Sequence, residues 1–250
     1  MTKRAERRLA PLALVLGAIS FSETAAAIDT LENYAPGLSD AEAYVGTDGL
    51  GGPPHGVTLA HSAGIGGGLT PRLSLFIGYE VTTNRQLAEA ARGLSTTLYG
   101  TLLQRTHLSL DLGATLHTGD SAASFAPFFE ANWDSVPDQG AWGLFTHGGP
   151  CAEGGEHIDW TWSQGFGGYV TAAEGHQLFT EWRTEFDLKR SPLIGQWQHG
   201  GLFAGYNAML VDNLELISEV GVNLPQDSGA TASAMVRSEE RRVGKECTIQ

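Results

Sequence analysis

Charged side chains recur at every second position in several stretches of this sequence. The densest stretch holds Glu181, Glu185 and Asp187, with Arg183 among them. Successive side chains of a β-strand point to opposite faces, so residues with this spacing would share one face. Fixed carboxylates around a water-filled space attract cations and polar solutes. The candidate lining residues are Glu80, Asp111, His117, Glu130, Asp159, Glu181, Arg183, Glu185, Asp187, Glu215 and Glu219.

The same residues have a second interpretation. A barrel of about twelve strands is intermediate in width between an eight-stranded barrel, which side chains fill, and an open porin. In a narrow barrel these charges would form hydrogen bonds with one another and plug the interior. The sequence leaves both interpretations open.

Four potential metal ligands lie close together in a glycine-rich stretch that we expect to be a loop. They are His147, Cys151, Glu156 and His157. Imidazole, thiolate and carboxylate groups all bind zinc, but this spacing matches no established zinc site. A glycine-rich loop also gives ligands no fixed scaffold. We therefore expect neither a metal nor another cofactor.

No arrangement of residues predicts catalysis. A nucleophile needs a base and an orienting acid beside it, and no spacing of Ser, His and Asp singles out such a set. The glycine strings Gly64–Gly68 and Gly165–Gly168 lie inside strand patterns, whereas a phosphate loop lies at a strand-to-helix turn. They are typical of kinks or close packing in a curved sheet. We expect no enzyme activity and no catalytic residues.

The elements that must position the charged residues are two-faced strands. In residues 108–117, leucine or alanine alternates with polar residues and glycine. Similar segments recur along the chain, and beyond residue 27 no apolar run is long enough for a membrane helix. About twelve strands are predicted: 40–47, 56–68, 72–83, 94–104, 107–118, 125–134, 140–147, 157–172, 176–188, 193–209, 213–224 and 230 onward.

The connections between these segments alternate in length. One set is mostly tight: 69–71, 105–106, 135–139, 173–175 and 210–212. The other set is mostly longer, with 189–192 as its short exception: 48–55, 84–93, 119–124, 148–156 and 225–229. Outer-membrane barrels have short periplasmic turns and longer outer loops. A soluble sandwich would give no such alternation and would have to cover each apolar face with a second sheet.

Aromatic residues fall near the predicted strand ends. Trp133 and Trp142 flank one tight connection and Tyr206 lies near another, whereas Trp160 and Trp162 follow a longer link. Such rings suit the two membrane–water interfaces, although ordinary core packing of each ring stays an alternative.

Both ends of the chain differ from the rest. A basic start, the apolar residues 9–21 and the small residues Ala25–Ala27 predict a signal peptide over residues 1–27. Residues 237–247 resemble the one-frame translation of a widely used DNA-sequencing adapter, with a charged natural tail as the alternative. We therefore expect a barrel domain over residues 28–236 and a foreign tail over residues 237–250.

Charge and cysteine content exclude other classes of protein. Residues 28–236 hold seven basic and 23 acidic side chains, a net charge of −16. Nucleic acid would be repelled by such a surface. Cys151 is the one cysteine in this segment, so no disulfide can form within it.

Three short segments resemble a known family. Residues 41–49, 68–75 and 205–216, the last with Gly205-Tyr206-Asn207 and Asp212-Asn213-Leu214, are similar to the outer-membrane transporter-like family named for the meta-pathway of phenol degradation. The resemblance spans roughly residues 28–236 and rests on turns and strand starts. It implies a barrel that passes small, aromatic or apolar molecules, and it carries no catalytic motif.

Together these patterns predict an all-β protein: an antiparallel up-and-down transmembrane β-barrel of about twelve strands, with its last strand truncated near Val236. We expect it in the bacterial outer membrane, with membrane lipid and the barrel-assembly machinery as partners and small solutes as cargo. The alternatives are a structural or binding barrel without transport, and a soluble exported all-β binding protein.

Overall fold

The computed structural model describes residues 39–50, 57–84, 89–120, 123–135, 141–154, 158–188, 196–211, 214–225 and 230–242. The expected residues 1–27 lie outside this part of the chain. Twelve strands account for the regular structure there: β1 Ser39–Leu50, β2 Thr58–Thr70, β3 Leu73–Asn84, β4 Glu89–Arg105, β5 Leu108–Gly119, β6 Ala123–Asp134, β7 Trp142–Gly154, β8 Ile158–Ala173, β9 His176–Asp187, β10 Gln196–Val211, β11 Leu214–Pro225 and β12 Thr231–Arg242. The described residues form no helix long and apolar enough to cross a bilayer.

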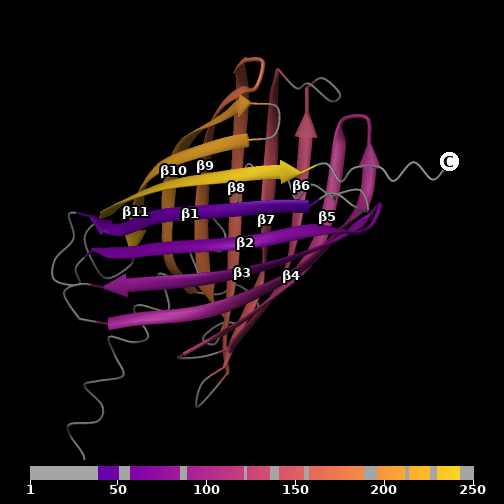
Figure 1. Cartoon of the computed structure of the whole chain (residues 1–250). Coiled ribbons are helices and arrows are strands. Elements are labelled where there is room, and N and C mark those ends of the chain that lie inside the picture. Colours follow the sequence, from indigo (N-terminus) through magenta and orange to yellow (C-terminus); the bar gives the residue numbers. More distant parts are fainter. Residues whose placement is uncertain are drawn as a thin grey trace, which may run out of the picture.

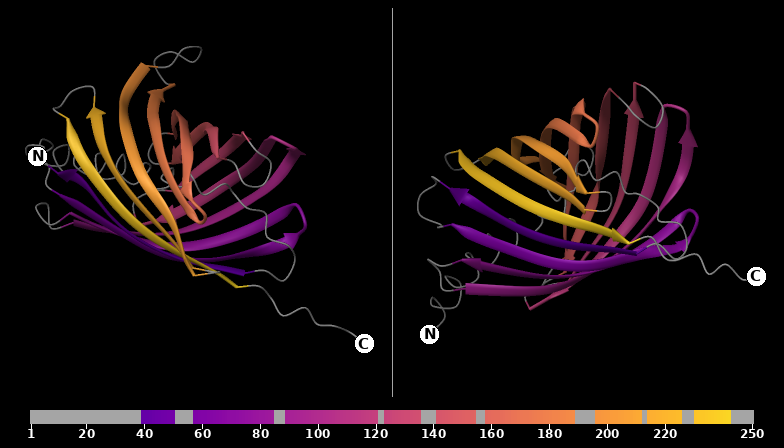
Figure 2. Two further views of the ribbon diagram at one scale, coloured as in Figure 1. Left: turned by 90° about the horizontal axis from the view of Figure 1, so that it is seen from above. Right: turned by 45° about the horizontal axis from the view of Figure 1, so that its top comes forward.

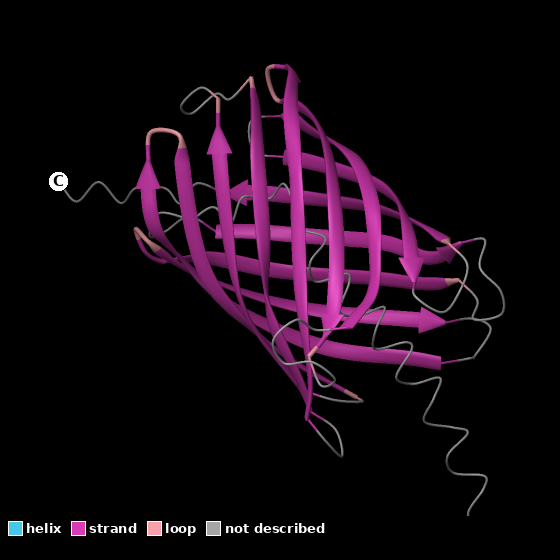
Figure 3. Cartoon of the chain, turned by 180° about the vertical axis from the view of Figure 1, so that it is seen from behind, coloured by secondary structure: helices cyan, strands magenta, loops and turns pink. Residues whose placement is uncertain are grey.

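The strands form one closed antiparallel barrel in which each strand pairs with its neighbours in sequence. Strand β12 pairs with β1 and closes the wall (Figures 1 and 2). Seen from behind, the wall is built of strands throughout (Figure 3). The predicted fold class and strand number are therefore confirmed.

The two faces of the wall differ as the period-two pattern predicts. Every strand carries at least one large apolar side chain that points outward, and Ile65 (67% exposed), Leu102 (62%) and Leu202 (57%) are among the most exposed. Charged and polar residues make up much of the buried set on the other face. A closed barrel leaves no unpaired edge, and an apolar outer face needs no second sheet when lipid covers it.

The strands extend further than the sequence predicted, most of all on β7 and β4. Residues 148–154, expected to be a loop, belong to β7 and pair with β8, and β4 begins at Glu89 rather than near residue 94. Glycine and small residues in these two segments obscure the alternation of apolar and polar residues. The segments still form strands, because the backbone hydrogen bonds of a sheet require no particular side chain. The link expected to be short, 189–192, lies between strands that end at Asp187 and resume at Gln196.

Strand β12 also runs past Val236. Its backbone pairs with β1 and β11 through residues of the segment that we expected to be foreign. The pairing includes Ser238 opposite Ala43 on one side and Leu216 on the other. The backbone of the last strand is therefore not shortened at Val236.

Inward-facing aromatic rings reach over glycines of neighbouring strands. A Cβ atom placed on Gly113 would come within 2.3 Å of the Phe128 ring, and one on Gly167 within 2.3 Å of the Phe145 ring. Phe203 covers Gly221 in the same way. The glycines thus let large rings lie along the wall instead of across the interior, as the interpretation of the glycine strings as close-packing points predicts.

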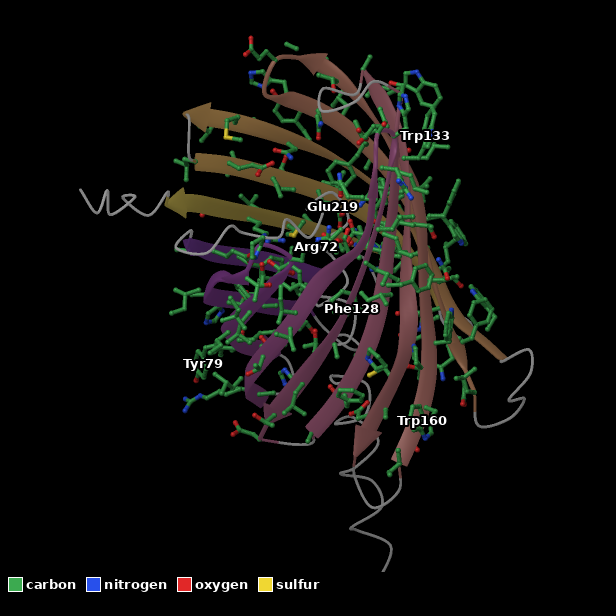
Figure 4. All side chains as sticks on the ribbon, turned by 90° about the vertical axis from the view of Figure 1, so that its right-hand side faces the viewer. Arg72, Tyr79, Phe128, Trp133, Trp160 and Glu219 are labelled. Carbon is green, nitrogen blue, oxygen red and sulfur yellow. The ribbon has the colours of Figure 1, made fainter. Side chains whose placement is uncertain are left out.

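The strand ends that the short turns join lie together at one end of the barrel, which we call the short-turn end, and the remaining strand ends lie at the opposite end, the loop end. Trp133 and Trp142 contact each other at the short-turn end, with ring centroids 5.0 Å apart. Trp160 lies at the start of β8, at the loop end. Figure 4 shows Trp133 and Trp160 near opposite ends of the strands, where two aromatic girdles of a membrane barrel would lie.

Candidate functional site

Most of the predicted lining residues are buried. Because the wall is a single layer with an apolar exterior, a buried charged side chain on a strand points into the barrel. The buried ones are Asp111, Glu130, Glu181, Arg183, Glu185, Glu215 and Glu219. Glu80, His117 and Asp187 are half-buried, and Asp159 is exposed near the start of β8.

Register brings several of these residues into one row across five consecutive strands. Asp111 on β5 lies opposite Glu130 on β6, which in turn lies opposite His147 on β7. His147 lies opposite Gly165 on β8, and Gly165 lies opposite Arg183 on β9. Residues directly opposite on neighbouring strands have Cβ atoms about 5 Å apart. The row therefore places Asp111, Glu130 and His147 side by side. Gly165, which has no side chain, separates them from Arg183.

Arg183 is the centre of a buried ion-pair cluster. Its Nη1 and Nη2 donate to the two carboxylate oxygens of Glu219, at 3.0 and 2.6 Å, and its Nε donates to Oε2 of Glu181 at 2.8 Å. The planar guanidinium matches a carboxylate with two parallel hydrogen bonds. The cluster, defined here as Glu181, Arg183 and Glu219, links β9 to β11 across β10.

His147 extends the cluster to β7. Its Nε2 lies 2.5 Å from Oε1 of Glu181. Both side chains lean over Gly165, where an added Cβ would come within 2.1 Å of the imidazole and 2.3 Å of the carboxylate. His147 was predicted as the last residue of a strand and as a candidate metal ligand, and not as a lining residue, so its place in the cluster was missed. The sequence did carry a signal for this position, because Phe145, His147 and Gly149 occupy every second position, as residues on one face of a strand do.

An aromatic ring supports the cluster from the next strand. The Cζ atom of Arg183 lies 4.1 Å from the centroid of the Phe203 ring on β10. A guanidinium over an aromatic face is attracted by the ring quadrupole. Phe203 was not predicted as part of the site, because its strand pattern indicates only that it is inward-facing and apolar.

A second buried ion pair lies at the seam between the first and last strands. Arg237 Nη2 lies 2.5 Å from Oε1 of Glu42. This pair was not predicted, because Arg237 was assigned to a foreign tail and Glu42 was not singled out. Arg183 and Arg237 are the arginines buried among the described residues, and both are held by carboxylates.

Other acids of the predicted set lie beside polar side chains other than arginine. Thr101 donates its hydroxyl to Asp111 at 2.6 Å, and the Asn132 amide donates to Glu130 at 2.7 Å. His199 Nε2 lies 3.6 Å from Glu185. The inner face is therefore extensively hydrogen-bonded, with more buried acids than buried arginines.

Two of the four candidate metal ligands lie in the described part of the chain. His147 and Cys151 lie on β7, and Glu156 and His157 lie outside the described residues. Among the residues that the structure describes, no group of three or more His, Cys, Asp and Glu side chains is arranged to hold a metal.

Comparison with known proteins gives matches in structure. No family model matches the chain, and no curated protein does. The outer-membrane channel COG4313 from Pseudomonas putida F1 superimposes with a TM-score of 0.58 at 11% identity, covering 85% of this chain and 98% of that one. The NanC porin gives 0.58 at 7% identity (81% and 98%), and the KdgM porin gives 0.56 at 12% identity (80% and 98%). The fold and the apolar outer surface are those of a protein of the bacterial outer membrane.

Proposed function

We propose that this barrel is a passive outer-membrane channel for small solutes, with a preference for cations. The observation that carries the proposal is the charge of the inner face. Asp111, Glu130, Glu185 and Glu215 are buried there in addition to the acids that hold the two buried arginines. A low-dielectric wall focuses the field of such charges into the interior.

Net charge also bears on the kind of solute. A structure of the KdgM porin has been determined with oligogalacturonate, whose sugar units carry carboxylates. Anions of this kind would be repelled by the inner face described above. The proposal is therefore passage of cations and neutral polar solutes, and it does not extend to acidic sugars.

Reversal potentials in planar bilayers test the proposal. In a KCl gradient the barrel should conduct and favour K⁺ over Cl⁻. Replacing the half-buried Glu80 and Asp187 with Gln and Asn should lower that preference, most strongly at low salt, where charges are least screened. Glu174→Gln, in the exposed β8–β9 turn, is the matched control. Conductance without cation preference, or equal potentials in both variants, would show that the carboxylates do not set the field.

A structural or binding barrel without transport is the second candidate. The dense packing of Glu181, Arg183 and Glu219 favours it, because Glu181 is only 1% exposed. A well-folded barrel that gives neither bilayer conductance nor solute uptake into liposomes would support this candidate. Either function is non-enzymatic.

The remaining features of the chain fit export and membrane insertion. We propose that residues 1–27 direct export and are removed, that residues 28–236 form the natural barrel domain, and that residues 237–250 are foreign to it. Lipid and the barrel-assembly machinery would then be its partners. The resemblance to the family of the phenol meta-pathway is likewise kept as a proposal.

A further inference from the structure

The inner face of β3–β6 carries an arrangement that the charged cluster does not use. Thr97 on β4 and Thr115 on β5 lie directly opposite each other, and their hydroxyl oxygens are 2.9 Å apart. Both side chains point inward, because the next residue on each strand, Leu98 or Leu116, is exposed on the apolar outer face. Both threonines are half-buried.

One aromatic ring flanks this hydroxyl pair. Phe128 on β6 lies against Gly113, two residues from Thr115. Phe76 on β3 lies directly opposite Thr97, but its ring leans toward β2, where Cβ atoms on Gly64 and Gly66 would come within 2.2 and 2.9 Å of it. We call Thr97, Thr115 and Phe128 the ring–hydroxyl patch. Figure 4 shows Phe128 at a height between those of Trp133 and Trp160, away from either end of the barrel.

The patch differs in exposure from the aromatic residues on the other side of the barrel. Phe128 is half-buried, whereas Phe145 is 4% exposed and Phe203 3%. The ring of the patch therefore keeps surface that a solute in the interior can contact.

We infer that the ring–hydroxyl patch binds neutral sugars of the size of a single pyranose ring. Binding sites for small molecules combine aromatic surface with a few placed polar groups. The C–H face of a pyranose packs on an aromatic face, and its hydroxyls both donate to and accept from threonine hydroxyls. A sugar carboxylate would meet the repulsion of the acidic inner face. The inference deepens the proposed function and rests on it for the passage of the sugar, though not for its binding.

Saturation-transfer NMR on the refolded barrel tests the inference without requiring passage. The barrel is kept in an amine-oxide detergent, because a sugar-based detergent would compete. Glucose should receive saturation from the protein, and galacturonate of the same ring size should receive much less. In Thr97→Val/Thr115→Val, the dissociation constant for glucose should rise about tenfold through the loss of two hydrogen bonds.

Thr180→Val is the matched control. Thr180 is exposed on the outer face of β9, so the glucose constant should not change. Heat-modifiable migration on gels verifies that each variant is folded, and the single Thr115→Val, expected to give about threefold by the same reasoning, serves if the double variant does not fold.

The outcomes separate this inference from the proposed function. Absence of transfer to glucose, equal transfer to glucose and galacturonate, transfer to phenol but not glucose, or equal constants in the double variant and Thr180→Val would each overturn the sugar site. Bilayer conductance of the same preparations tests the channel. A barrel that binds glucose and does not conduct contradicts the channel alone, and one that conducts without binding glucose contradicts the sugar site alone.

Discussion

The two sides of the barrel interior differ in how tightly their inward-facing side chains are packed, although both follow the same alternation of residues. On β7–β11, charges and rings are packed until Glu181, Arg183 and Phe203 are almost inaccessible. On β2–β5, four inward-facing hydroxyl residues, Ser62, Ser95, Thr97 and Thr115, stay half-buried, although Asp111 and Tyr99 are buried on the same strands. The side formed by β7–β11 contains buried ion pairs that contribute to stability. The side formed by β2–β5 leaves side-chain surface that a solute can contact. Stability and binding should therefore respond to substitutions on opposite sides.

Breaking the ion-pair cluster should give the largest loss of stability. Arg183→Ala leaves Glu181 and Glu219 buried without their cation, and removing one partner of a buried pair costs about 3–5 kcal/mol. The measurement is urea unfolding in detergent micelles, followed by tryptophan fluorescence. Arg92→Ala, on an exposed residue of β4, removes the same charge and should cost less than about 1 kcal/mol. Similar losses in the two variants would contradict the division between the sides.

Filling the gap under the cluster should give the next largest loss. In Gly165→Ala the new methyl group would lie within 2.3 Å of both His147 and Glu181, and such overpacking costs about 1–3 kcal/mol. Gly154→Ala is the control, because its nearest contact is the Ala123 carbonyl oxygen at 3.3 Å. Both variants are compared by the temperature at which the heat-modifiable band shifts. If the Gly165→Ala band shifted at the same temperature as the wild-type band, His147 and Glu181 would have moved apart without loss of stability, and the prediction would be wrong.

The seam between β1 and β12 allows a test of the C-terminal segment. Arg237→Gln removes the ion pair with Glu42, whose side chain is 20% exposed, so the expected loss is about 1–2 kcal/mol after discounting for solvent. Replacing residues 237–250 with an alternating apolar strand that ends in an aromatic residue should instead improve insertion into liposomes. Lipid-facing Arg or Lys costs about 2–4 kcal/mol near the midplane. Equal insertion of the two chains would show that the tail is not foreign to the fold.

The ring–hydroxyl patch should give the smallest change in stability. Thr97→Val removes one of two hydroxyls that bond to each other, at a net cost of about 1 kcal/mol or less. The unfolding free energy in urea is again the measure. A loss as large as that of Arg183→Ala would show that the two sides do not differ in their roles.

The sequence predicted the architecture well because membrane strands carry their pattern locally. The leucines of residues 108–117 identify β5 without reference to any other part of the chain. Strand ends were predicted less well where glycine replaced the alternation, as in residues 148–154. Predicting the charged cluster required the register between strands, which cannot be read from the sequence. Alternation placed Glu181, Arg183 and Glu219 on inward faces, but pairing across β10 and the gap at Gly165 decide that they meet.

The rings that lie on glycines have a consequence for how this sequence can diverge. Phe128 occupies the space in which a side chain at Gly113 would lie, and Phe145 does the same at Gly167. A change of either glycine to a larger residue is tolerated only if its ring is exchanged for a smaller one. Such pairs should therefore vary together in related barrels: positions 113 and 128 should hold one large and one small residue, in either order, more often than two large ones.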